Sequence, residues 1–216
     1  MLNIKKFTFN EFYENTYVIW DEKSKEGLIV DPGCSNLQEE NILKSFIKER
    51  NLSIKHLLNT HCHLDHVMGC KFVKENFNPV YLIPEKDLPF IEHIDQQSAF
   101  LGVEIEKPPM PDNFITEELL LNIGGTVPKF LYTPGHSPGE YCVYFENEKF
   151  CITGDVLFQG NIGRTDLWGG DYDTLLNSIK QKLFTLPDDT VIYPGHGENS
   201  EIGLEKKENP FLISQG

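Results

Sequence analysis

Apolar residues recur along the sequence in short runs that glycine, proline and polar turns interrupt, a pattern typical of β-strands. Three such runs open the chain, at residues 4–9, 16–21 and 27–33. Leu43, Phe46 and Ile47 then fall on one face of a predicted helix over residues 36–50. The first part of the chain is therefore expected to be β-rich and to end in a helix.

The succession of strand and helix patterns continues to the end of the sequence. Further strands are predicted at residues 54–60, 79–83, 127–135, 140–147, 148–155 and 189–195. Further helices are predicted at residues 67–77, 87–100 and 173–184, with a polar helix near the C-terminus. Two similar halves of this kind indicate an α+β fold with two sheets flanked by helices.

Two segments allow more detailed predictions. Residues 140–155 are expected to form a hairpin in which Tyr144 faces Cys151, so that the thiols of Cys142 and Cys151 are not directly opposite each other. Residues 84–111 are less regular, and the three prolines between 107 and 111 forbid regular structure there. This segment is either a flap over a functional site or a packed surface excursion.

Length and composition narrow the functional classes. With 216 residues, 39% hydrophobic and 24% charged, the chain is expected to form one soluble domain over residues 1–216. It has no apolar run long enough for a transmembrane helix and no secretory signal, so neither a membrane nor export is expected. The net charge of −14, without a basic stripe, argues against nucleic acid as a partner. Five irregularly spaced cysteines predict free thiols in a reducing cytoplasm.

The stretch NTHCHLDHVMG, residues 59–69, carries the strongest chemical signal. It places His61, His63, Asp65 and His66 within six positions, and packing these groups together without a metal would carry a desolvation cost. Three more candidate ligands follow strand-like runs, each in a turn that contains glycine. These are His136, Asp155 and His196.

Seven candidate ligands exceed the needs of one metal ion. Five imidazoles and two carboxylates suit zinc, and also iron or manganese. Two metals would use about three ligands each, with one carboxylate bridging ions that lie roughly 3.5–4 Å apart. Asp155 is the natural bridge, because a carboxylate has two oxygens that can bind separate ions. His56 and His93 are expected to be structural or exposed. Cys62, which lies between two candidate ligands, is expected to point away from them and to be non-catalytic.

These residues resemble the signature of the metallo-β-lactamase superfamily, T-H-x-H-x-D-H, which is present as THCHLDH from Thr60 to His66. The sequence is more narrowly similar to the short glyoxalase II-like hydrolases. The likeness covers nearly the whole chain and is carried by TPGHSPGEYCVY, TGDVLFQGNIGRTDLWGGD, LPDDTVIYPGHG and EIGLEKKENPF. It implies one metallo-β-lactamase-like domain, a four-layer αββα sandwich with the site at one edge of two sheets.

The resemblance also implies roles for the candidate ligands. His61, His63 and His136 would bind the first metal; Asp65, His66 and His196 would bind the second; and Asp155 would bridge them. Full-length glyoxalase II enzymes carry a further C-terminal region that binds glutathione, whereas this sequence ends about 20 residues after His196. The resemblance therefore implies the hydrolytic core rather than glutathione recognition.

A dinuclear site of this kind would lower the pKa of a bound water from about 15.7 toward about 7, producing a metal-bound hydroxide nucleophile. The sequence shows no dedicated general acid, which favours a leaving group that departs as a stable anion, such as a thiolate with a pKa of about 8.5. A thioester such as S-lactoylglutathione is therefore the first substrate to test, with Asp65 accepting a proton. Arg164 would bind a substrate carboxylate or, as we favour, pair with Asp166 or Asp171.

Two alternatives remain at this stage. Persulfide dioxygenases share the fold and the G-R-T-D segment at Gly163–Asp166, and they would hold one iron through His61, His136 and Asp155. A metal-binding module without catalytic activity is the second alternative, although such relatives typically lose ligands. β-Lactam hydrolysis is disfavoured because a periplasmic enzyme needs an export signal. The oligomeric state is not indicated by the sequence.

Overall fold

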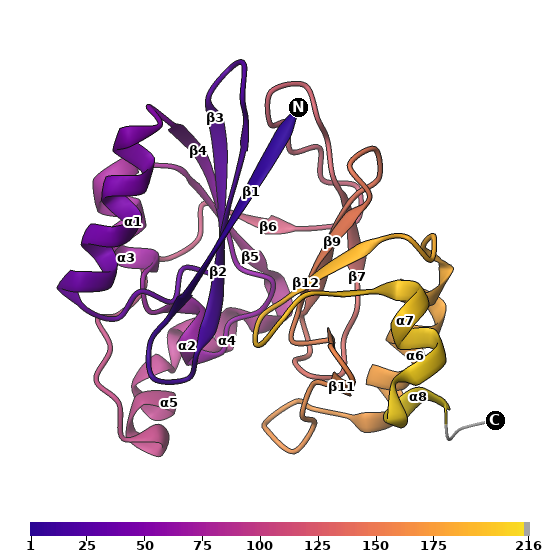
Figure 1. Ribbon diagram of the computed structural model, residues 1–216. Helices are drawn as coiled ribbons and strands as arrows, with labels where there is room; N and C mark the ends of the chain where they lie inside the picture. Colours follow the sequence, from indigo (N-terminus) through magenta and orange to yellow (C-terminus); the bar gives the residue numbers. More distant parts are fainter. Residues whose placement is uncertain (214–216) are drawn as a thin grey trace. The chain divides into compact units, whose positions relative to one another are not determined.

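The computed structural model describes residues 1–213, which fall into two compact units (Figure 1). The first unit comprises Met1–Phe114 and Leu121–Thr126. The second comprises Ile115–Leu120 and the chain from Val127 onward. Each unit is built around its own sheet.

The sheet of the first unit has six strands in the order β1-β2-β3-β4-β5-β6. Their bounds are β1 Leu2–Phe9, β2 Glu14–Asp21, β3 Glu26–Val30, β4 Ser53–Leu58, β5 Val80–Pro84 and β6 Asn113–Ile115. The pairs β1–β2 and β2–β3 are antiparallel, whereas β3–β4 and β4–β5 are parallel. The carboxyl ends of β3 and β4 therefore meet at one edge of the sheet, where open α/β sheets usually bind ligands.

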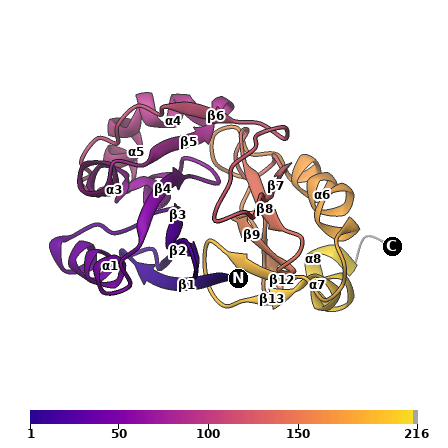
Figure 2. The same cartoon turned by 90° about the horizontal axis from the view of Figure 1, so that it is seen from above.

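Helices of the first unit cover one face of this sheet. The helical segments are α1 Leu37–Glu49, α2 Leu64–Val67, α3 Cys70–Phe77, η1 Glu85–Asp87, α4 Leu88–Glu92 and α5 Ile94–Leu101. Asn36 begins α1 by accepting hydrogen bonds from the backbone N–H groups of Gln38 and Glu39. The buried face of α1 and Val73 of α3 join one hydrophobic core with β2, β3 and β4 (Figures 1 and 2).

The second unit contains a five-stranded sheet in the order β13-β12-β9-β8-β7 and a separate two-stranded hairpin. The strands are β7 Lys129–Tyr132, β8 Tyr141–Phe145, β9 Phe150–Gly154, β12 Val191–Pro194 and β13 Ser200–Glu201, and the hairpin is β10 Leu157–Phe158 with β11 Asn161–Ile162. Strands β9 and β12 are parallel neighbours, so the turns that follow them lie at the same edge.

One face of the second sheet is covered by helices that contribute to a separate core (Figure 2). The helical segments are α6 Tyr172–Gln181, η2 Leu183–Thr185, α7 Ile202–Glu208 and α8 Pro210–Ile213. Leu175 and Ile179 of α6 are fully buried beside Ile192 of β12 and Ile202 of α7. Thr174 donates its backbone N–H to the side chain of Asp171, which caps α6.

Most predicted elements are confirmed, and two predicted helices are divided. The helix predicted over 67–77 is interrupted before Cys70, where the backbone N–H of Gly69 donates to the backbone oxygen of Pro32 at 2.7 Å instead of to a helical carbonyl. A side chain at Gly69 would collide with Cys34 and Pro32. The helix predicted over 87–100 divides at His93 into α4 and α5. The hairpin register is confirmed, since Tyr144 pairs with Cys151.

Candidate metal centre

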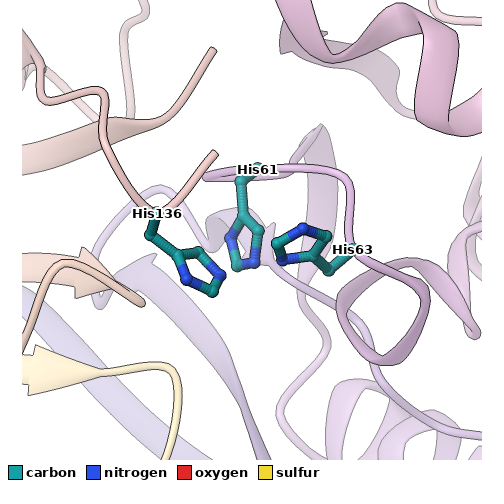
Figure 3. A group of neighbouring side chains, drawn as sticks. All are labelled: His61, His63 and His136. Carbon is teal, nitrogen blue, oxygen red and sulfur yellow. The ribbon is translucent and has the colours of Figure 1, made fainter. Parts of the chain in front are cut away.

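The histidine-rich loop leaves the carboxyl end of β4 and runs into α2. His61 and His63 project from this loop (Figure 3), with their rings edge to face and the ring centroids 4.8 Å apart. The ring centroid of His66, in α2, lies 4.1 Å from that of His61. The structure therefore brings the three predicted histidines of the first unit together, and all three are buried.

A buried carboxylate, Asp31, braces this loop from the end of the neighbouring strand β3. Its Oδ1 accepts the backbone N–H of Thr60 at 2.7 Å, and its Oδ2 accepts the Thr60 hydroxyl at 2.6 Å. Asn59 adds a side-chain bond to Oδ1 at 3.3 Å, and Nδ1 of His66 lies 3.2 Å from Oδ2. The sequence analysis did not include Asp31, although it follows a strand as the predicted ligands do.

The hydrogen bonds around His61 fix which ring nitrogen carries the proton. The single hydroxyl hydrogen of Thr60 is donated to Asp31, so the Thr60 oxygen accepts the N–H of His61 Nδ1 across 3.1 Å. Nε2 of His61 then presents its lone pair for a metal. A ligand histidine that donates its second ring N–H in this way is characteristic of metal sites.

Asp65 is the remaining candidate ligand of the first unit. Its Oδ2 lies 3.7 Å from Nε2 of His66, and its side chain is 16% exposed, so solvent reaches the carboxylate. Asn10 donates its side-chain N–H to the backbone oxygens of both Asp65 and Gly33, at 3.0 and 2.9 Å. The turn between β1 and β2 therefore holds the backbone of this ligand in place.

Two other buried groups near the loop have perturbed pKa values. Burial raises the pKa of Glu14 well above its usual range, which favours the neutral form of this carboxyl group. Burial likewise raises the pKa of the Cys62 thiol, so it is a poor nucleophile. All five cysteines are free, as predicted, and all five are buried.

The second unit assembles the other three predicted ligands. His136 follows β7 (Figure 3), Asp155 follows β9 and His196 follows β12. Oδ2 of Asp155 lies 3.5 Å from Nε2 of His136 and also 3.5 Å from Nε2 of His196. One carboxylate oxygen is thus equally distant from two imidazole nitrogens, an arrangement that suits a bridging ligand.

The backbone around Asp155 and His136 is tightly constrained. Nδ1 of His136 donates to the backbone oxygen of Arg164 at 2.8 Å, so Nε2 carries the lone pair that faces Asp155. Gly163 lies against the backbone oxygen of Asp155, where a Cβ atom would approach to 1.9 Å. The buried carboxylate of Glu140, another residue that the sequence analysis did not include, accepts the backbone N–H of Asp155 at 2.7 Å.

Arg164 pairs with Asp166, one of the two partners favoured by the sequence analysis. Nε and one terminal N–H group of Arg164 donate to the two oxygens of Asp166, each at 2.7 Å. This pairing lowers the pKa of Asp166 to about 2. Both side chains are more than half exposed, so the pair holds the loop at the surface.

The donor sets fit divalent metal ions. Ligand atoms of His61, His66 and Asp31 lie within 4.8 Å of one another in the first unit, and the second unit contributes two imidazoles around one carboxylate. Imidazole and carboxylate donors, with ring tautomers fixed by hydrogen bonds, are what zinc, iron and manganese require. Asp31 already accepts three hydrogen bonds, which indicates a bracing role rather than ligation.

Comparison with known proteins identifies the family. The model of the metallo-β-lactamase superfamily matches residues 9–196. The chain belongs to this superfamily. Hydroxyacylglutathione hydrolase GloC of Haemophilus influenzae is 39% identical over 216 residues, which cover 99% of this chain and 100% of the relative.

Two solved structures support the assignment and the fold. BLEG-1, described as a B3 metallo-β-lactamase, superposes with a TM-score of 0.90 at 34% identity and covers 99% of this chain and 100% of its own. TTHA1623 in a di-iron-bound form gives a TM-score of 0.85 at 34% identity over 96% of this chain and 100% of its own. The protein therefore has the metallo-β-lactamase fold, in the α+β class, and is a metallo-hydrolase of a superfamily that binds divalent metals.

No helix within residues 1–213 combines the length and the apolar character that crossing a bilayer requires.

Proposed function

We propose that the protein is a dinuclear metal-dependent hydrolase of a thioester, with S-lactoylglutathione or a related acyl-thiol as substrate. The observation that carries the proposal is the set of seven candidate ligands, part of which lies in each unit, with the ring of His61 in the first unit and that of His136 in the second oriented by hydrogen bonds. The relative named as a hydroxyacylglutathione hydrolase supports the choice of substrate, because the alignment spans essentially both chains.

In this proposal the two ligand sets share a pair of divalent ions, of which zinc is the first candidate. His61, His63 and His136 would hold one ion, Asp65, His66 and His196 would hold the other, and Asp155 would be shared by both. When bound, such a pair supplies a hydroxide nucleophile at neutral pH and stabilises an oxyanion. The di-iron form of TTHA1623 shows that a relative holds two metals, and iron is therefore the second candidate here.

The reaction breaks the C–S bond of the thioester and forms a C–O bond with the oxygen of water. Asp65 accepts the proton that the water loses, because its carboxylate is the most exposed group of the first ligand set. The thiol leaves as a thiolate that is stable near neutral pH, so no general acid is needed. The products are a carboxylic acid and a free thiol.

Two alternative roles are considered for Arg164. Its bidentate bonds to Asp166 favour a role in holding the loop whose backbone oxygen orients His136. The alternative, in which Arg164 binds a substrate carboxylate, remains a prediction.

The proposal is tested by elemental analysis of the purified protein beside assays on S-lactoylglutathione, a β-lactam and a persulfide. We expect two metal ions per chain and preferential hydrolysis of the thioester. About one iron per chain with oxygen uptake on the persulfide would replace the hydrolase by a dioxygenase. Preferential opening of the β-lactam, the activity in the description of BLEG-1, would overturn the choice of substrate.

Two variants test the assignment of the ligands. Asp155→Ala removes the bridge and is expected to lose both metals together, whereas His196→Ala is expected to retain about one metal per chain. Full metal content in the first variant would contradict the bridge. Unchanged stoichiometry in the second would contradict the role of His196.

A further inference from the structure

The side-chain amide of Gln97, on α5, holds the backbone on both sides of His63. Its Oε1 accepts the backbone N–H of Leu64 at 3.1 Å, and its Nε2 donates to the backbone oxygen of Cys62 at 3.3 Å. The second N–H of Nε2 donates to the backbone oxygen of Phe90 at 3.1 Å. Reversing this amide would place its oxygen against two carbonyl oxygens, so the orientation is unambiguous.

The contact provides a hydrogen-bond acceptor at the start of α2. His63 occupies the N-cap position of this helix and makes no side-chain capping bond to it. Serine, threonine, aspartate or asparagine usually fills that position, because the side chain satisfies an N–H group of the first turn. Gln97, on a separate helix 33 residues further along the chain, accepts the N–H group of Leu64, the first residue of α2, and leaves the imidazole available for a metal.

Two further contacts from the same segment surround His63. Oδ2 of the buried Asp87 accepts the backbone N–H of Cys62 at 3.1 Å. The ring of Phe90 meets the His63 ring edge to face, with centroids 5.0 Å apart. Residues 87–97 thus contact the backbone before and after His63 as well as its ring. Gln97 alone among these three side chains bonds to the peptide groups on both sides.

We propose that Gln97 is a positioning residue that sets the direction of the His63 side chain and thereby the affinity of the first metal. The proposal rests on the proposed function only in taking His63 as a metal ligand. Residues 87–97, which are part of the segment 84–111, would therefore restrain the loop that carries His63.

The test compares Gln97→Met with Gln96→Met. Methionine keeps the length and helix propensity of glutamine but removes both hydrogen-bonding groups. Gln96 is exposed on the same helix and, among residues 1–213, its side chain makes no hydrogen bond, so its variant is a matched control. Three measurements are made: exchange of the Leu64 amide in the metal-free protein, zinc affinity by competition with a chelator, and kcat and KM for the thioester.

For Gln97→Met we expect the Leu64 amide to exchange several-fold faster and zinc to bind about 10–100-fold more weakly, as for other groups that orient a metal ligand. We also expect kcat to fall more than KM changes. Gln97→Glu keeps the acceptor for Leu64 but turns its second oxygen toward the carbonyl oxygens of Cys62 and Phe90, so it should not restore slow exchange at Leu64. The Gln96→Met control should match the parent protein.

Each contrary result is distinct. Faster exchange with unchanged zinc affinity would overturn positioning and leave only a helix cap. Exchange and affinity equal to those of Gln96→Met would overturn the contact itself. A parent protein that binds metal but does not hydrolyse thioesters would refute the proposed function, whereas the exchange and affinity measurements would still test Gln97.

Discussion

Replacing Asp31 by asparagine tests whether the ligand loop of the first unit depends on this buried carboxylate. Oδ1 accepts two N–H groups, from the Thr60 backbone and the Asn59 side chain. Oδ2 accepts the Thr60 hydroxyl and lies 3.2 Å from Nδ1 of His66. Asparagine has the same shape, but one of its two terminal groups is a donor and would face donors in either orientation.

The cost follows from these contacts. A buried donor left without an acceptor costs about 1–3 kcal/mol, and Asp31 accepts two hydrogen bonds at Oδ1 and one at Oδ2. The Thr60 hydroxyl can rotate to accept from the new amide, which recovers part of the loss. We therefore expect Asp31→Asn to lower the free energy of unfolding by about 2–3 kcal/mol, which a domain stabilised by about 5–15 kcal/mol survives.

The assay is urea unfolding of the metal-free protein, followed by zinc titration against a chelator. Because the relay from Asp31 through Thr60 orients His61, zinc affinity should fall by about 10–100-fold. Asp95→Asn, on the exposed face of α5, makes the same change in charge and serves as the control. A free energy of unfolding within about 0.5 kcal/mol of the parent, with unchanged zinc affinity, would refute the bracing role.

Three further variants have defined outcomes. Glu205→Ala leaves three hydrogen-bond donors in the second unit without their buried acceptor. This variant should lower the free energy of unfolding, measured in urea, by about 3 kcal/mol or more, and a loss below about 1 kcal/mol would contradict the role of Glu205. Because burial raises the pKa of Glu14, the parent protein loses stability as the pH rises above about 4.3, where the unfolded chain releases this proton. In the metal-free state, Glu14→Gln should therefore become more stable relative to the parent protein as the pH rises, by at most about 1.4 kcal/mol per pH unit. A stability difference that does not depend on pH would count against a neutral Glu14. Asp166→Asn should leave the urea midpoint nearly unchanged, because the pair with Arg164 is exposed. The same variant should lower kcat/KM, because it loosens the loop. A lower KM for thioesters that carry a carboxylate would instead assign Arg164 to binding of the substrate.

The strands that carry the site could be predicted because their signals are local. Each predicted ligand follows an apolar run and a turn, and parallel strands such as β9 and β12 bring their following turns to the same edge. The two-residue strands β10, β11 and β13 were not predicted, because two residues are too few to show a period. The break before Cys70 was also missed, since it depends on contacts of Gly69 with residues more than 30 positions away.

The residues that support the candidate ligands were harder to predict than the ligands themselves, because their contacts span long stretches of sequence. Asp31 contacts Thr60 across 29 positions, Gln97 contacts Leu64 across 33, and the chain between them gives no sign of either contact. Asp31 shares the strand-and-turn setting of the ligands and could have been identified from it. Gln97 lies among polar residues of a helix, and the local sequence there looks like that of any solvent-exposed helix face.

Each unit orients one of its candidate ligand rings through contacts of its own. The ring of His61 is held through Thr60 and Asp31, and the ring of His136 is held by the backbone oxygen of Arg164. A ligand fixed by protein contacts loses little conformational entropy when the metal binds, so more of the binding free energy appears as affinity. Because these contacts lie within the units, loosening one of them should weaken the site without unfolding the sheet that carries it.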